Sequence, residues 1–348
     1  MLVERFAQNP LIVPADVIPS RKDLQVVGAF NAGVTVYKDE IILLLRVAEC
    51  PKDKKADEEL APILNVATGD IESLRIKLDD HDLEPLDSRV FRYKKKIYLT
   101  SISHLRIARS KDGIHFTIDP KPAVFPERDY ENYGIEDPRI SKIDDDYYIA
   151  YKVVSDKGIG VGLLKTTDFK NFERKGIIFC PENIDVVLFP EKINGKFYAL
   201  TRPVPVHMGP RGIWIASSPD LLYWGEHKPL VLPRPETFDG AKTGGSCVPI
   251  KTDEGWLEIY HGSDADDRYS LALVLLDLND PSKVLARSRE PLMQPEADYE
   301  IKGFYGNVVF SCGAITKEDG SVIIYYGASD ELIAGAVTTI DKMLDILR

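Results

Sequence analysis

The stretch DDDYYIAYK, residues 144–152, decides how the rest of the chain is interpreted. Three acidic residues form a turn signal, and an aromatic, β-prone run follows them. The same pattern recurs along the chain, and Tyr98, Tyr148 and Tyr198 fall 50 residues apart. A turn followed by a strand is therefore a repeating element. Its other copies are YKDEIILLL (37–45), YKKKIYLTS (93–101), INGKFYALT (193–201), DEGWLEIYH (253–261) and EDGSVIIYY (318–326).

A second alternating strand follows most copies and often ends in a Ser/Thr-x-Asp turn. These segments are LRIARSKDGIHF (105–116), GVGLLKTTDFKNF (160–172), GIWIASSPDLLYW (212–224) and SLALVLLDLNDP (270–281). A period of about 40–50 residues with several short strands is typical of a β-propeller, in which each repeat is one blade. We therefore expect an all-β fold, a five-bladed β-propeller with a central-channel active site. A β-sandwich or two stacked β domains is the alternative, but their strands need not repeat one local pattern.

Helical patterns are sparse. Only KADEELAPILN (55–65) and TTIDKMLDILR (338–348) have plausible helical periodicity, the first at an insertion and the second at the end of the chain. No Pro/Gly/Ser-rich linker divides the sequence. We therefore expect a single catalytic domain over residues 1–348, with a short terminal helix at about 338–348.

Composition limits the possible partners. The formal net charge of −11 argues against nucleic acid and against an anionic membrane as partners, since a polyanion needs a basic face. The opening MLVERFAQNPLIVP has no apolar segment of signal-peptide length, and no apolar run approaches the roughly 20 residues that span a bilayer. The four cysteines, Cys50, Cys180, Cys247 and Cys312, form no CxxC pair, which favours reduced thiols. We expect a soluble, cytoplasmic protein that could form a homo-oligomer.

In a propeller the innermost strand of each blade lines the central channel. Polar residues just before each aromatic run should therefore converge from distant parts of the sequence. The corresponding segments are AFNAGVTVY (29–37), EDPRISKI (136–143), DVVLFPEKI (185–193), AKTGGSCVPIK (241–251) and YGNVVFSCGAI (305–315). Further candidates follow the runs themselves: Arg46, Arg106, His261 and Asp330.

Each candidate also has an ordinary structural explanation. Arg46 could be a solvated charge at a strand end, His261 a hydrogen-bonded structural imidazole, and Lys242 a loop lysine. Asp137 could form a turn before Pro138. A ring of Arg, Lys and His around carboxylates at equivalent positions is nevertheless more than a structural channel needs. Adjacent side chains of a strand point to opposite faces, so we expect Glu136 to turn away from the face that Asp137 uses.

At these residues the sequence resembles glycoside hydrolase family 130, the mannoside phosphorylases with a five-bladed propeller fold. The resemblance runs from about Asn31 to Asp330 and looks most like the branch that acts on β-1,2-linked mannobiose or short β-1,2-mannan. The matching segments are FNAGV, LLLRVAE, RIARSKDGIHF, GIEDPRI, VVLFPEKINGKFYAL, IWIASSPDL, KTGGSCVPIKTDEGWLEIYHG and YYGASD.

The resemblance implies an inverting reaction in which inorganic phosphate, a co-substrate rather than a cofactor, attacks C1 of the mannosyl unit. It makes Asp137 the catalytic acid, whose proton passes through the 3-hydroxyl of that unit. Phosphate needs cationic donors rather than a general base, and the expected phosphate-binding residues are Arg46, Arg139, Lys242, His261 and Tyr269. The expected mannoside-binding residues are Asn31, Arg106 and Asp330. Glu136 is expected to be structural, oriented by Arg139.

The sequence differs from the family pattern at one place, and it leaves three alternative functions open. Some relatives carry an Arg-Asn pair before the VLFP strand that helps to bind phosphate, whereas this chain has Ile184-Asp185 there. A hydrolytic β-mannosidase on the same fold would use Asp137 as acid and Asp185 or Asp264 as base. A phosphorylase for another linkage, such as β-1,4, is the second rival, and a non-catalytic sugar-binding propeller is the third. The histidines show no HxH or HExxH spacing, so we expect no metal.

Overall fold

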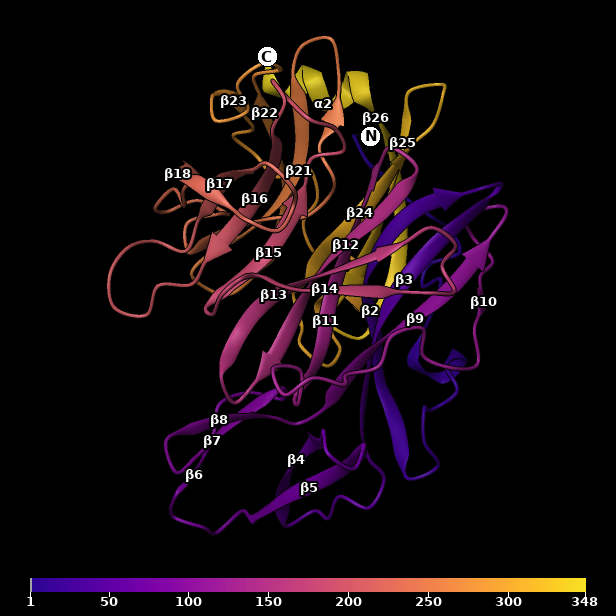
Figure 1. Cartoon of the computed structure of the whole chain (residues 1–348), viewed down its shortest axis with the longest axis vertical. Helices are drawn as coiled ribbons and strands as arrows, with labels where there is room; N and C mark the ends of the chain where they lie inside the picture. Colours follow the sequence, from indigo (N-terminus) through magenta and orange to yellow (C-terminus); the bar gives the residue numbers. More distant parts are fainter. Residues whose placement is uncertain (1) are drawn as a thin grey trace.

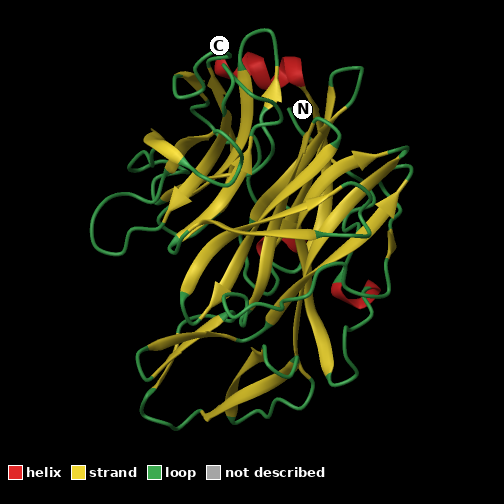
Figure 2. Cartoon of the chain, viewed as in Figure 1, coloured by secondary structure: helices red, strands yellow, loops and turns green. Residues whose placement is uncertain are grey.

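The protein is an all-β molecule. The computed structural model describes residues 2–348, in which strands dominate and helices are short (Figure 2). Many strands are buried along nearly their whole length, and Leu43, Leu44 and Leu45 have no exposed surface. A continuous apolar run such as IILLL suits a strand that is covered on both faces. The expected all-β class is therefore confirmed.

Antiparallel pairing divides most strands of residues 2–348 into five units of four main strands. The first unit contains β2 (Leu24–Tyr37), β3 (Glu40–Pro51), β9 (Ile102–Ser110) and β10 (Thr117–Ile118). The second contains β11 (Gly134–Ile143), β12 (Asp146–Ser155), β13 (Gly158–Thr166) and β14 (Glu173–Phe179). The third contains β15 (Asn183–Leu188), β16 (Phe197–Pro203), β17 (Ile213–Ser218) and β18 (Gly225–Val231).

The last two units complete the series. The fourth contains β19 (Lys242–Gly245), β21 (Trp256–Ser263), β22 (Tyr269–Leu276) and β23 (Val284–Arg287), with β20 (Ile250–Lys251) also paired to β21. The fifth contains β24 (Val309–Thr316), β25 (Ser321–Ala328), β26 (Leu332–Thr339) and β1 (Glu4–Arg5). Because β1 pairs with β26, the two ends of the chain build one unit together, and both termini lie at the upper end of Figure 1.

Neighbouring units contact each other through their edges. Single parallel bridges join Gly33 to Cys312 and Gly134 to Ser103, so the fifth, first and second units form one 12-stranded sheet. The hydroxyl of Ser141 donates to the carbonyl of Leu188 between the second and third units. Parallel bridges Arg211–Lys242 and Tyr269–Val308 join the third unit to the fourth and the fourth to the fifth.

An inserted arm, residues 52–101, separates β3 from β9 and projects at the lower end of Figure 1. It contains β4 (Glu58–Asn65), β5 (Asp70–Lys77), β6 (Leu83–Pro85), β7 (Val90–Tyr93) and β8 (Lys96–Leu99). Its own small core contains Ala61, Ile76 and Phe91. The helix expected at 55–65 is therefore wrong. That segment is a strand of a hairpin, because pairing with β5 and burial of alternate residues outweigh a weak helical pattern that Pro62 already interrupts.

The terminal helix is confirmed. α2 spans Ile340–Leu347, and the Thr339 side chain caps it by accepting a hydrogen bond from the Lys342 backbone N–H. The remaining helical segments of residues 2–348 are η1 (Pro14–Asp16) and α1 (Asp298–Ile301). None of the helices in the described chain has the length and apolar character needed to cross a membrane. All four cysteines are free thiols.

Candidate active site

The first strands of three units, β2, β11 and β15, carry the same irregularity. In β2 the pairing with β3 passes from Phe30–Arg46 to Gly33–Leu44, so two residues face one. β11 and β15 contain the same bulge, after Glu136 and after Ile184. Its first residue has a positive φ in each strand, 46° for Asn31, 45° for Asp137 and 54° for Asp185. Asn and Asp tolerate this left-handed conformation better than most residues, which explains their presence at these equivalent positions.

A basic residue pairs with the position just before each bulge. Arg46 lies opposite Phe30, Lys152 opposite Glu136, and Arg202 opposite Ile184. These three basic side chains line one cavity together with Asn31, Asp137 and Asp185. The repeated backbone geometry therefore brings three cations and three polar or acidic groups to one place, although they come from three separate units.

The cavity has a volume of about 240 Å³. Acidic and basic residues both line it, and aromatic and aliphatic side chains complete the wall. The remaining lining residues include Arg89, Glu136, Tyr269, Tyr305, Phe310 and Asp330. A small concave site with a few convergent polar groups is the usual form of a small-molecule binding site.

Asp137 is held by three donors. Its Oδ1 accepts from Asn31 Nδ2 at 3.0 Å and from Arg46 Nη1 at 3.1 Å, and its Oδ2 lies 2.5 Å from Lys152 Nζ. Burial favours the neutral carboxyl, but the positive charges of Lys152 and Arg46 outweigh it and hold the pKa of Asp137 well below its usual value. Asp137 is therefore a carboxylate in the ligand-free protein.

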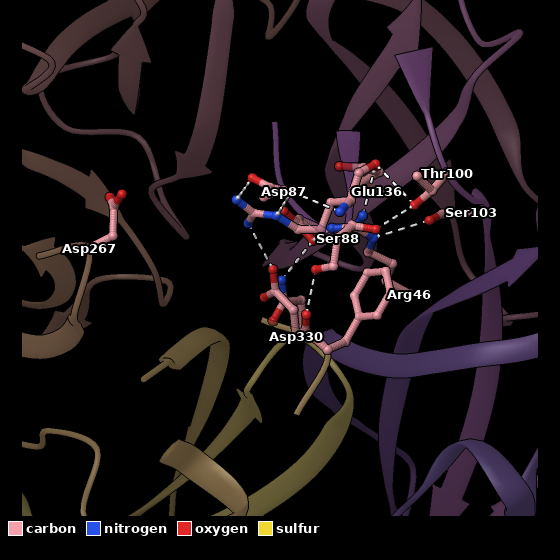
Figure 3. A network of polar contacts seen from close by, with 12 residues as sticks. Arg46, Asp87, Ser88, Thr100, Ser103, Glu136, Asp267 and Asp330 are labelled. Carbon is pink, nitrogen blue, oxygen red and sulfur yellow. Dashed lines mark hydrogen bonds and ion pairs between the residues drawn. The ribbon is translucent and has the colours of Figure 1, made fainter. Parts of the chain in front are cut away.

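Glu136 faces the same cavity, contrary to the expectation from strand alternation. Its Oε1 accepts from Arg46 Nη2 at 2.8 Å, and its Oε2 lies 3.0 Å from Lys152 Nζ (Figure 3 shows the Arg46 and Glu136 side chains together). The left-handed conformation of Asp137 breaks the alternation of side chains along β11. The carboxylates of Glu136 and Asp137 therefore both contact Arg46 and Lys152. The predicted pairing of Glu136 with Arg139 was also wrong, since Arg139 bonds elsewhere.

A second charged cluster surrounds Asp185. Arg139 Nη2 donates to its Oδ1 at 2.9 Å, and Arg202 Nε lies 2.8 Å from its Oδ2. Burial raises the pKa of Asp185, but the charges of Arg202, His261 and Arg139 lower it to well below its usual value. Arg139 also donates to the backbone carbonyl of Asp137, so the two clusters are joined.

His261 is completely buried beside this cluster. Its Nε2 lies 3.3 Å from Asp185 Oδ2, and its Nδ1 lies 3.0 Å from Ser246 Oγ. Burial lowers the pKa of His261 to about 4, so its imidazole is neutral at pH 7. Gly244 makes this packing possible, because a Cβ there would lie 2.4 Å from His261 Cε1 and 2.6 Å from Asp185 Oδ2.

Lys242 and Tyr269 form a third group. Lys242 Nζ lies 4.5 Å from the centroid of the Tyr269 ring and donates to Asp267 Oδ1 at 2.9 Å. In Figure 3, Asp267 stands apart from the other labelled side chains. The ring of Tyr269 lines the cavity and also contacts the His261 ring, with centroids 6.2 Å apart. Tyr269 therefore connects Lys242 to the buried cluster.

Asp330 contrasts with Asp137. It lies in the turn after β25, lines the cavity, and accepts from Arg89 Nη1 through Oδ2 at 3.1 Å. Burial raises the pKa of Asp330, and Arg89 and Arg46 only partly oppose that rise. Two carboxyl groups whose pKa values shift in opposite directions within one cavity are typical of sites that hold and release protons.

The structure does not bring Arg106 to this cavity. Its buried guanidinium donates from Nη1 to the Ile18 carbonyl at 2.5 Å, and its Nη2 lies 3.1 Å from His104 Nε2. Strand alternation explains the difference, because Leu105, rather than Arg106, lies opposite Arg46 in the pairing of β3 with β9. Arg106 therefore makes a structural contact with Ile18 and His104 and does not line the cavity.

Sequence reasoning missed several cavity residues, among them Lys152, Arg202, Arg89 and Tyr305. A signal for the first two was present. Lys152 ends DDDYYIAYK and Arg202 follows INGKFYALT, which are the positions that correspond to Arg46 after YKDEIILLL. Arg89 lies in the inserted arm, outside the repeat, and had no such signal.

Comparison with known proteins adds independent findings. The family model Glyco_hydro_130, described as β-1,4-mannooligosaccharide phosphorylase, matches residues 76–348. The β-1,2-mannobiose phosphorylase of Listeria innocua serovar 6a is 48% identical over 348 residues, which is 99% of this chain and 98% of that protein. The 1,2-β-oligomannan phosphorylase of Thermoanaerobacter sp. strain X514 is 45% identical over 239 residues, 68% of this chain and 78% of that protein.

A solved structure is also similar over the whole chain. The structure of the L. innocua β-1,2-mannobiose phosphorylase in complex with β-1,2-mannobiose has a TM-score of 0.97 at 48% identity. The match covers 100% of this chain and 99% of that chain. The backbone that positions the cavity described above is thus shared with a protein solved with a disaccharide.

Proposed function

We propose a function from one established premise: the chain belongs to glycoside hydrolase family 130 and is an enzyme. It catalyses the reversible phosphorolysis of β-1,2-mannobiose, or of short β-1,2-mannooligosaccharides. The products are α-mannose 1-phosphate and mannose or the shortened oligomer. The full-length identity of 48% to a β-1,2-mannobiose phosphorylase is the observation that carries this proposal.

Asp137 supplies the proton in this reaction. The bond from C1 to the leaving sugar breaks, phosphate forms a new bond to C1 on the opposite face, and the leaving oxygen takes the proton through the 3-hydroxyl. In the ligand-free protein Arg46 and Lys152 hold Asp137 as a carboxylate. A phosphate dianion entering among the cations offsets their charge and raises the pKa of Asp137, so that Asp137 takes up a proton from solvent before the glycosidic bond breaks.

The phosphate site comprises the five residues expected from the sequence. Lys242 contacts Tyr269, whose ring lines the cavity, and this supports a joint role, with Lys242 as the point charge. Arg139 and His261 meet at Asp185, where His261 would act as a neutral imidazole. Arg46 binds phosphate and also donates a hydrogen bond to Asp137. Arg202 adds a cation on β16 that compensates for the missing arginine at Ile184.

The mannosyl unit is bound by Asn31 and Asp330. The Asn31 amide donates hydrogen bonds to its hydroxyl groups and accepts them, and the Asp330 carboxylate only accepts them. Both line the cavity that contains Asp137. Asn31 lies against Gly327, since a Cβ there would lie 2.1 Å from Asn31 Oδ1, and Gly327 is three residues before Asp330 in the chain. This proximity supports one shared sugar site.

We also infer that the five units form a five-bladed β-propeller around this cavity. Support comes from the contacts of each unit with the next, including the Gly33–Cys312 bridge between the fifth and the first. The pairing of β1 with β26 would then close the ring with both ends of the chain. A cytoplasmic location and a homo-oligomeric state remain predictions.

The linkage is tested by comparing substrates. We expect kcat/KM in the presence of phosphate to be highest for β-1,2-mannobiose, with β-1,4-mannobiose much poorer. The comparison matters because the matching family model is described by the β-1,4 activity. Preference for β-1,4-mannobiose would overturn the proposed linkage and leave the phosphorylase assignment in place.

A further inference from the structure

The inserted arm reaches back to the active site. Ser88 Oγ donates to the Phe304 carbonyl at 2.5 Å, across 216 positions of sequence. The next residue, Arg89, places its guanidinium 3.5 Å from the centroid of the Tyr305 ring. Figure 3 shows Asp87 and Ser88 of the arm beside Asp330. The turn between β6 and β7 of the arm therefore contacts the segment before β24, although the arm otherwise has its own core.

Arg89 is fixed on several sides. Asp87 binds it through both carboxylate oxygens, with Nη2–Oδ2 at 3.0 Å and Nε–Oδ1 at 3.3 Å. Its Nη1 donates to Asp330 Oδ2 at 3.1 Å, and both residues line the cavity. A guanidinium held by a carboxylate and an aromatic face loses little freedom when it bonds a second carboxylate. Its direction toward Asp330 is therefore set before any ligand binds.

Asp330 needs a cation beside it to stay ionised. Burial and the nearby charge of Asp137 both favour its neutral form, and Arg89 and Arg46 favour the carboxylate. Arg46 already bonds Glu136 and Asp137, so it is shared among several acids. Arg89 is the cation that donates a hydrogen bond directly to Asp330. A carboxylate that accepts sugar hydroxyls must stay ionised and keep its orientation, and Arg89 meets both needs.

We propose that Arg89, delivered by the inserted arm, is a positioning residue that keeps Asp330 ionised and oriented for binding the mannosyl unit. The proposal rests on the proposed function and deepens it. Arg89 acts through Asp330 and takes no part in bond making or breaking. The arm is accordingly a component of the active site, and the five repeating units alone leave Asp330 without its directly bonded cation.

The first test replaces Arg89. In Arg89→Ala we expect KM for β-1,2-mannobiose to rise about tenfold or more, as for loss of a charged hydrogen bond, with a smaller change in kcat. Arg89→Lys should recover part of the loss. Arg92→Ala is the matched control, because Arg92 lies on the same arm and pairs with Glu84 away from the cavity. Equal KM values in Arg89→Ala and Arg92→Ala would overturn the proposal.

Two further readouts separate positioning from a merely structural role. Removal of the cation raises the pKa of Asp330, so the acid limb of log(kcat/KM) should move to higher pH by about one unit. In an Asp330→Asn background, Arg89→Ala should cost almost nothing further, because its target is already neutral. An unmoved acid limb, or a full additional loss in the double variant, would contradict action through Asp330.

The outcomes also distinguish this proposal from the proposed function. If the unmodified protein releases no mannose 1-phosphate from β-1,2-mannobiose and phosphate, the proposed function is wrong. The proposed role of Arg89 is then wrong as well, because it rests on that function. If that reaction proceeds and Arg89→Ala behaves like the unmodified protein, only the role of Arg89 fails. Thermal unfolding of each variant establishes that the arm and the units remain folded.

Discussion

Lys152 Nζ lies 2.5 Å from Asp137 Oδ2, and the two residues come from adjacent strands whose pairing is interrupted at Asp137. The bulge turns Asp137 toward the lysine that pairs with the preceding residue, Glu136. Pro138 fits the bulge because it has no backbone N–H to contribute to the ladder. The sequence Glu-Asp-Pro-Arg therefore places the reactive carboxylate through its backbone geometry, and Lys152 then sets its charge state.

Replacement of Asp137 tests its role as the acid. Asp137→Asn removes the proton source but little volume, so we expect turnover to fall by about 10²–10⁴-fold or more while β-1,2-mannobiose still binds. Steady-state kinetics and a binding isotherm measure the two effects. Asp145→Asn, in an exposed turn before β12, is the control. Near-normal turnover in Asp137→Asn would remove Asp137 from the mechanism.

Replacement of Lys242 tests the phosphate site. Lys242→Ala removes a cation beside Tyr269, so KM for phosphate should rise about tenfold or more, with a much smaller change in KM for the mannoside. Lys251→Ala offers a control in the same unit, because Lys251 pairs with Glu191 at the surface. Equal changes in both KM values would mean that Lys242 does not bind phosphate.

Gly244 tests the packing of the buried cluster. An added methyl group would clash with His261 and Asp185, so Gly244→Ala should lower the free energy of unfolding by about 1–3 kcal/mol. Gly225→Ala provides the control, because a Cβ there meets nothing within 4 Å. Urea unfolding measures both variants. Equal stability of the two would show that the cluster adjusts to the extra volume without cost.

The buried His261 predicts a pH dependence of stability. Its pKa in the folded protein is about 4, below the usual value of about 6.5. The unfolded chain therefore takes up a proton at higher pH than the folded one, and stability falls as pH decreases from about 6.5 to 4, by up to about 3 kcal/mol from this group. Urea unfolding at several pH values measures the slope.

A matched pair of variants isolates that contribution. His261→Asn should flatten the slope of the unfolding free energy between pH 6.5 and 4. His207→Asn should leave it nearly unchanged, because His207 is exposed in the loop between β16 and β17. Identical slopes in the two variants would show that protonation of His261 does not drive the loss of stability.

The repeating pattern predicted much of the fold. Turn-and-strand segments such as DDDYYIAYK form β12, and the last residues form α2, because local turn signals and a strong amphipathic pattern agree there with long-range packing. The segment 55–65 was mispredicted as a helix. Its conformation depends on pairing with β5, and that long-range contact has no counterpart in a local periodicity.

The site was predictable where it follows the repeat. Asn31, Arg46 and Asp137 line the cavity as expected, and Lys152 and Arg202 could have been found at positions equivalent to Arg46. Glu136 was mispredicted because alternation assumes a regular strand, and a bulge breaks it. Arg89 comes from the inserted arm, where only the three-dimensional structure relates it to Asp330.

One measurement tests the central claim most directly. The protein is incubated with β-1,2-mannobiose with and without inorganic phosphate, and NMR follows the products and the anomeric form of the first one released. We predict equal amounts of α-mannose 1-phosphate and mannose, formed only when phosphate is present. Release of two mannose molecules per disaccharide, independent of phosphate, would contradict the account and identify a hydrolase.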